Sequence, residues 1–151
     1  MPYCLLLMRS RREAREVVLK TLYRVEATGN TAEEAYNDVC MNWSRSPFDE
    51  VYAQRLLKGI TTNVEGIDAI LKDIVKNWDI ERIAIIDRNI LRIAICEVVY
   101  FDDIPPKVSM DEAIEIAKIY STSDSGKFVN GILDKVVKRE KQRKQERTMD
   151  L

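Results

Sequence analysis

Four arginines near the start of the chain are the residues whose types and spacing point most clearly to a chemical role. They are Arg9, Arg11, Arg12 and Arg15. Only two acidic residues, Glu13 and Glu16, lie beside them. Positive charge near a helix N-terminus opposes the helix dipole, so helix stability does not explain this cluster. Guanidinium groups bind phosphate oxygens in pairs, which makes phosphate binding the functional interpretation. The alternative is a solvated helix end with local ion pairs.

A polar turn before the last helix is the second candidate anion site. Its residues of interest are Asp124, Ser125, Gly126, Lys127 and Phe128. A helix N-terminus offers unpaired N–H groups to an anion, Lys127 adds positive charge, and Phe128 is placed to stack on a nucleobase. The alternative is ordinary capping by Asp124, with Phe128 in the core. The Gly-Lys pair is not a Walker phosphate loop, because the earlier glycine and the preceding strand are missing.

A polar stripe along an otherwise apolar stretch, residues 79–101, is the third candidate. The apolar character of the stretch predicts a central element, either one bent helix or two consecutive helices, with Asp87 placed to cap the second. A charge as deep as that of Arg92 needs an acidic partner, so an internal ion pair is expected. The alternative is that Glu81 and Asp87 stay exposed and receive a basic partner protein.

The composition disfavours an enzyme. The chain has no histidine, which removes the commonest general base and the commonest metal ligand. The sequence shows no metal cluster and no nucleophile–base pair, so we expect no catalysis, metal or cofactor. Three cysteines without a CxxC pair fit a reducing cytoplasm. The most apolar stretch, residues 80–101, contains six charged residues, which argues against a membrane span.

The elements that position these residues are predicted to be helices throughout. Long apolar periodic runs with few Gly and Pro indicate an all-α fold of about seven helices in two packed bundles. The first helix is expected at about residues 10–28. Thr31 and Glu34 predict a capping box for the second. The third is either one long helix with a soft point or two helices joined near Asn63.

The sequence also predicts the starts of two further helices and a close contact at one glycine. Ser46 is expected to cap the third helix, with Pro47 at its first position. Ser109 and Glu112 predict a second capping box before the polar turn. Gly131 lies inside the last helix, where glycine costs about 1 kcal/mol relative to alanine. We therefore expect another backbone to pack closely against Gly131.

The chain is predicted to contain one helical domain with two lobes. Residues 1–9 are expected to form a flexible extension and residues 10–138 the domain, with lobes at about 10–78 and 79–138. Residues 139–151 form a basic tail that is expected to be disordered. Most basic tails of this kind are solvated extensions. The alternative is that this tail adds weak, salt-sensitive RNA affinity.

The charge is unevenly distributed along the chain. Residues 1–30 and residues 138–151 each carry six basic and three acidic side chains, whereas residues 31–137 carry twelve basic and nineteen acidic ones. Basic ends on an acidic body are typical of proteins that contact an anionic polymer.

Four blocks of the sequence, in order and with matching spacing, resemble the NusB family. They are Arg11–Glu16 with Leu22 and Tyr23, Asp87–Ala94, Asp111–Lys118, and Ser125–Asp134. The resemblance covers roughly residues 9–138. It implies an all-helical bacterial transcription antitermination factor that works in the cytoplasm.

The resemblance also implies partners and site residues. Family members pair with NusE, a small-subunit ribosomal protein, and the pair binds boxA RNA of ribosomal leader transcripts and thereby acts indirectly on the RNA polymerase elongation complex. Arg12 and Arg15, together with the 124–128 turn, would face RNA. The residues at or near the partner surface would be Tyr23, Glu81 and Asp87.

The residues and the resemblance suggest one mechanism, in which the arginine cluster and the 124–128 turn form a shared surface for single-stranded RNA. A basic partner on the acidic body would supply the missing affinity. The rival interpretations are the RNA-recognition domain of a ribosomal RNA methyltransferase, a purely protein-binding scaffold, and a Cys- or carboxylate-based hydrolase. Monomer and homodimer both stay open.

Overall fold

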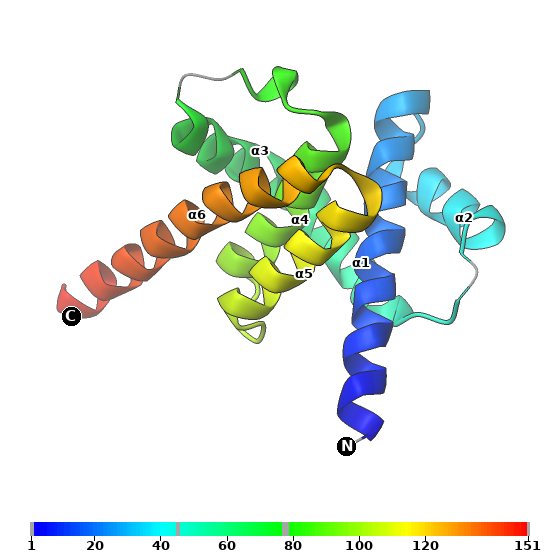
Figure 1. Cartoon of the computed structure of the whole chain (residues 1–151), viewed down its shortest axis with the longest axis horizontal. Helices are drawn as coiled ribbons and strands as arrows, with labels where there is room; N and C mark the ends of the chain where they lie inside the picture. Colours follow the sequence, from blue (N-terminus) through cyan, green and yellow to red (C-terminus); the bar gives the residue numbers. More distant parts are fainter. Residues whose placement is uncertain (1, 45, 77–78, 151) are drawn as a thin grey trace. The chain divides into compact units, whose positions relative to one another are not determined.

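The structure, a computed structural model, describes residues 2–44, 46–76 and 79–150 (Figure 1). Over these ranges the chain forms six α-helices, one short 3-10 helix and no strand. The elements are α1 (Pro2–Thr28), α2 (Ala32–Asn42), α3 (Glu50–Val75), η1 (Ile80–Arg82), α4 (Ile85–Tyr100), α5 (Pro106–Tyr120) and α6 (Ser123–Met149). The predicted all-α class is confirmed.

The chain divides into two compact units inside α3. Unit 1 is Met1–Thr62 and unit 2 is Asn63–Leu151. Asn63 has non-helical torsions (φ −112°, ψ 15°), so the soft point predicted there is a kink in α3. The sequence placed the lobe boundary near residue 78, which lies outside the described residues. The boundary comes earlier because the second half of α3 pairs with later helices: Asp68 with Arg92 on α4, and Asp73 with Arg139 on α6.

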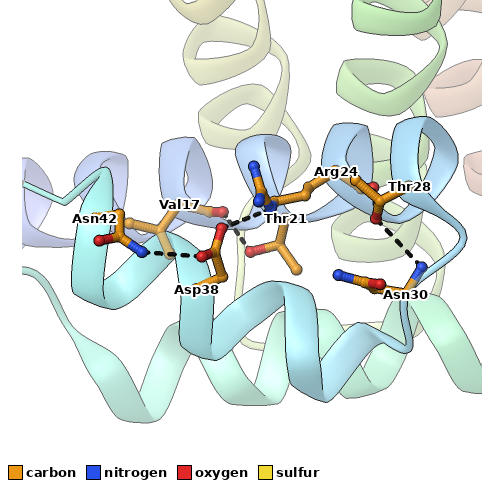
Figure 2. Close-up of polar contacts among 7 residues, drawn as sticks. All are labelled: Val17, Thr21, Arg24, Thr28, Asn30, Asp38 and Asn42. Carbon is orange, nitrogen blue, oxygen red and sulfur yellow. Dashed lines mark hydrogen bonds and ion pairs between the residues drawn. The ribbon is translucent and has the colours of Figure 1, made fainter.

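In unit 1, α1 and α2 lie side by side (Figure 2). Arg24 on α1 forms an ion pair with Asp38 on α2 (2.5 Å), and Asn42 donates a hydrogen bond to the same carboxylate (2.9 Å). The predicted capping box is present: the Thr31 hydroxyl accepts from the Glu34 N–H, and the Glu34 carboxylate accepts from the Thr31 N–H. Before it, Gly29 adopts φ +74°, which glycine tolerates best, and ends α1.

In unit 2, α4, α5 and α6 contact one another pairwise. Helix α4 is the most buried element, as its apolar sequence predicted, and η1 precedes it as a separate short helix. Arg92 on α4 binds both carboxylate oxygens of Asp68 (2.9 and 3.0 Å) and the side-chain oxygen of Asn89 (3.1 Å). The internal ion pair expected for Arg92 is confirmed.

Four predicted helix starts were wrong. Helix α1 begins at Pro2, so the expected extension is helical, although its side chains Leu5, Leu6, Leu7 and Met8 are exposed. Helix α3 begins at Glu50, because the Asp49 carboxylate, and not Ser46, accepts the Tyr52 N–H (3.0 Å). Helix α5 begins at Pro106, whose fixed φ suits a first helical position, and this leaves Ser109 buried inside the helix. Helix α6 begins at Ser123, inside the expected turn.

The cap expected at Asp87 and the close packing expected at Gly131 were also wrong. The N-cap of α4 is Ala84, and Asp87 lies in the first turn of the helix. A Cβ built at Gly131 meets no atom of the described residues within 4 Å. By contrast, a Cβ at Gly66 would lie 2.5 Å from the Tyr100 hydroxyl, so the close approach occurs on α3.

The basic tail is helical as far as Met149 instead of disordered. Lys, Arg, Gln and Glu are good helix formers, and side chains three or four residues apart pair along it. Arg143 binds Glu140 (3.1 Å), and Lys138 binds Asp134 (2.9 Å).

Within the described ranges, no helix is both long enough and apolar enough to span a membrane. The same ranges contain no grouping of three His, Cys, Asp or Glu side chains suited to a metal ion.

Candidate nucleic-acid interface

The arginine cluster of α1 is held against one aromatic ring of α3. The guanidinium carbon of Arg11 lies 4.7 Å from the centroid of the Tyr52 ring, and that of Arg15 lies 5.4 Å from it. Positions 11 and 15 are one helical turn apart, so both reach the same ring. Tyr52 is only 3% exposed and Arg15 only 2%. Cation–π contacts with a buried ring therefore fix the direction of two of the four predicted arginines.

The remaining arginines differ in exposure. Arg12 and Arg11 are half-buried and Arg9 is exposed. Arg9 lines a groove of about 550 Å³ that also contains residues of α1 and of the segment before α3. The other lining residues are Leu6, Leu7, Ser10, Glu13, Ser46 and Pro47. The cluster therefore presents its charge chiefly through positions 9, 11 and 12, with Arg15 beneath them.

The second site is the first two turns of α6. Thr122 caps the helix, since its hydroxyl accepts from the Ser125 N–H (3.3 Å). Ser125 and Gly126 are buried, whereas Asp124 and Lys127 are exposed and Phe128 is half-buried. The predicted set therefore divides: Asp124, Lys127 and Phe128 reach the surface, and the two small residues face the interior.

A hollow of about 320 Å³ adjoins this helix start, between α6 and the end of α3. Its lining combines apolar side chains with two lysines: Ile74, Val75, Lys127, Phe128, Gly131, Ile132 and Lys135. Positions 127, 131 and 135 are spaced by four residues and so lie on one face of α6. An apolar floor with cationic neighbours suits a ligand that is flat and anionic.

The expected partner residues have different environments. Tyr23 is 48% exposed on α1, and Glu81 is exposed on η1. Asp87 is only 7% exposed, so the expectation that it stays exposed was wrong. Its carboxylate accepts a hydrogen bond from the Ser125 hydroxyl (3.0 Å), which ties the start of α4 to the start of α6. The acidic group therefore has a structural partner inside unit 2.

Three residues of these sites were missed from the sequence. Tyr52 was not predicted as a site residue, because nothing in its spacing connects it with residues 11 and 15. Lys135 and the open side of Gly131 were also missed. Their four-residue spacing from Lys127 was a readable signal, since it places all three on one helix face.

The chain is all-α and has two units. One unit carries clustered cations and the other a lysine-lined hollow. These features define a small helical binding protein. Comparison with known proteins narrows that class. The model of the NusB family matches residues 12–138, and the chain belongs to this family.

Individual relatives agree with the family match. The transcription antitermination protein NusB of Salinibacter ruber is 47% identical over 135 residues, which cover 86% of this chain and 82% of the relative. A solved structure of T. maritima NusB is 38% identical, with a TM-score of 0.75, over 85% of this chain and 90% of that one. A structure of the antitermination factors NusB and NusE in complex with double-stranded RNA matches at 29% identity and a TM-score of 0.77, over 87% of this chain and 98% of that one.

Proposed function

We propose that this protein is a transcription antitermination factor that binds boxA-type single-stranded RNA of ribosomal leader transcripts together with a NusE-type ribosomal protein. It is a non-catalytic adaptor that acts in the bacterial cytoplasm and reaches RNA polymerase only indirectly. The observation that carries the proposal is that the family match at residues 12–138 includes Arg12, Arg15, Lys127 and Phe128.

The chemistry of the two sites supports RNA as the ligand. In unit 1, Arg9, Arg11 and Arg12 provide guanidinium groups that bind phosphates, and the stacking of Arg11 on Tyr52 restricts its motion before the ligand arrives. In unit 2, Lys127 and Phe128 offer a cation and an aromatic ring beside the hollow. Phosphate contacts position a strand, while stacking and polar contacts select its unpaired bases. That one RNA strand contacts both units stays a prediction.

A titration of boxA-type RNA with and without the NusE-type protein tests the function. We expect weak binding by this chain alone and tighter binding with the partner, because the two proteins then hold one RNA through linked surfaces. A duplex of the same sequence is titrated in parallel, since the similar NusB–NusE structure contains double-stranded RNA. Equal affinity with and without the partner, or a preference for the duplex, would contradict the proposal.

Variants of the arginine cluster locate the site. Arg12→Ala with Arg15→Ala is expected to weaken RNA binding and to lower the salt dependence by about 0.7 per lost phosphate contact. Since Arg15 is buried, Arg12→Ala is also measured alone, with thermal melting to confirm folding. Lys58→Ala, an exposed site on α3, is the control for loss of one charge. Unchanged RNA affinity in the folded double variant would remove this site assignment.

A further inference from the structure

Gly131 has no structural explanation within the described residues. It lies in the interior of α6, where glycine weakens a helix relative to alanine. Its φ is not positive, since Gly29 is the only glycine of the described residues with that conformation. A Cβ at this position would meet no described atom within 4 Å. Among the described residues, neither the backbone conformation nor the packing requires a glycine at position 131. A remaining use for it is the close approach of a ligand to the helix backbone.

The space beside Gly131 is the hollow of about 320 Å³. This volume is near the lower end of the range for small-ligand pockets, ~300 Å³. Ile74, Val75 and Ile132 provide its apolar lining, and Phe128 adds an aromatic ring. The hollow is therefore of a size and character for one flat, mostly apolar group.

Two lysines stand on either side of Gly131 along α6. Lys127 and Lys135 are both exposed and both line the hollow. Eight residues of helix separate them by about 12 Å along the axis, so they are spaced for two anionic groups instead of one. The nearest acidic side chain on this part of α6, Asp134, is paired with Lys138 (2.9 Å). The rim is therefore cationic, which favours a polyanion over a neutral peptide.

We propose that this hollow holds one unstacked base of single-stranded RNA, with the phosphates on its two sides contacting Lys127 and Lys135. The missing Cβ of Gly131 lets the nucleotide approach the backbone of α6. This inference rests on the proposed function and adds to it a defined one-nucleotide subsite within unit 2.

A filling variant tests the subsite. Gly131→Leu places a side chain in the hollow without replacing any packed atom, so thermal melting should show a protein at least as stable as the wild type. We expect about tenfold weaker binding of boxA-type RNA in the presence of the NusE-type protein, the order of loss for one stacked base. Gln145→Leu, an exposed position on α6 outside the hollow, should bind like the wild type.

Two further measurements distinguish a base subsite from general charge. A set of boxA-type RNAs, each with one abasic position, is titrated against both proteins. We expect one of these RNAs to bind the wild type more weakly than the intact RNA does. The same RNA should bind Gly131→Leu with the affinity that this variant has for the intact RNA. Lys135→Gln should lower the salt dependence by about 0.7, whereas Lys58→Gln, at an exposed lysine of α3 outside the hollow, should not.

The outcomes separate this inference from the proposed function. Wild-type affinity in folded Gly131→Leu, together with weakened binding in Arg12→Ala, would overturn the subsite and leave the function standing. Gly131→Leu that loses the partner protein but binds RNA normally would show that the hollow holds a protein side chain, which overturns the subsite as well. No RNA binding by the wild type with its partner would overturn both.

Discussion

Several buried or partly buried polar side chains pair with residues that lie far away in the sequence, among them Asp87 with Ser125 and Arg92 with Asp68. Arg92 and Asp68 are 24 residues apart and share two hydrogen bonds in a partly buried setting. The sequence predicted that Arg92 needs an acidic partner but not which one, because helix periodicity relates neighbours within one helix and says nothing about contacts between helices. Tyr52 was missed as a partner of Arg11 and Arg15 for the same reason.

Loss of the Asp68 carboxylate should therefore destabilise the fold. Asp68→Ala leaves the guanidinium of Arg92 without its bidentate partner, and we expect a loss of about 2–3 kcal/mol in the free energy of unfolding. Asp134→Ala removes an exposed pair with Lys138 and should cost only about 0.5 kcal/mol. Urea unfolding of both variants checks this. Equal losses would contradict the ranking.

Tyr36 on α2 is expected to make the fold less stable at alkaline pH. Burial raises the pKa of Tyr36 to about 12. The unfolded phenol ionises near pH 10, so the unfolded state loses this proton first. The stabilising contribution is present below about pH 10 and is lost as the pH rises toward 12. Between those pH values, the melting temperature of Tyr36→Phe should therefore fall less than that of the wild type. An equal fall of the melting temperature in both proteins would contradict this.

At the scale of elements, two of the wrong helix starts lie where a second start signal competed with the predicted one. Thr31 and Glu34 cap α2 as predicted, since no other start signal lies nearby. At α5, Pro106 starts the helix before the Ser109 signal, and at α3 the Asp49 carboxylate replaces Ser46. Which of two adjacent signals prevails depends on tertiary packing, which a single sequence does not show. The number and type of helices were predictable because their apolar periodicity is long.

The contact between α3 and α4 at Gly66 gives a test at this scale. A Cβ at Gly66 would lie 2.5 Å from the Tyr100 hydroxyl but 3.8 Å from the ring carbon that carries it. In the wild type, the clash should offset the helix stabilisation of Gly66→Ala. In Tyr100→Phe, the same change should stabilise by about 1 kcal/mol. Unfolding of the four proteins in a double-mutant cycle measures this, and identical effects in both backgrounds would contradict it.

At the scale of the whole molecule, two units separated at Asn63 each carry one cationic site. Acidic side chains outnumber basic ones along residues 31–137, while both ends of the chain are basic. The charge distribution and the resemblance together predicted an RNA-binding adaptor. The environments of single site residues were less predictable. Asp87 is buried and accepts a hydrogen bond from Ser125 of α6, and a Cβ at Gly131 would meet no described atom within 4 Å.

The adaptor function predicts reciprocal coupling. If the NusE-type protein raises the affinity of this chain for boxA-type RNA by a given factor, the RNA must raise the affinity for the protein by the same factor. We expect a factor of about 10–100 at fixed salt, which corresponds to ~1–3 kcal/mol. Calorimetric titrations in both orders measure the two factors. A factor of one would contradict the adaptor function.

The most direct measurement of the central claim is photocrosslinking of one boxA-type RNA from both units. A photoreactive side chain replaces Arg9 in unit 1 in one variant and Asp124 in unit 2 in another, and Lys58 in a control; all three positions are exposed. The account predicts crosslinks from positions 9 and 124 to different nucleotides of the same RNA and none from position 58. Crosslinks from only one of the two units would contradict it.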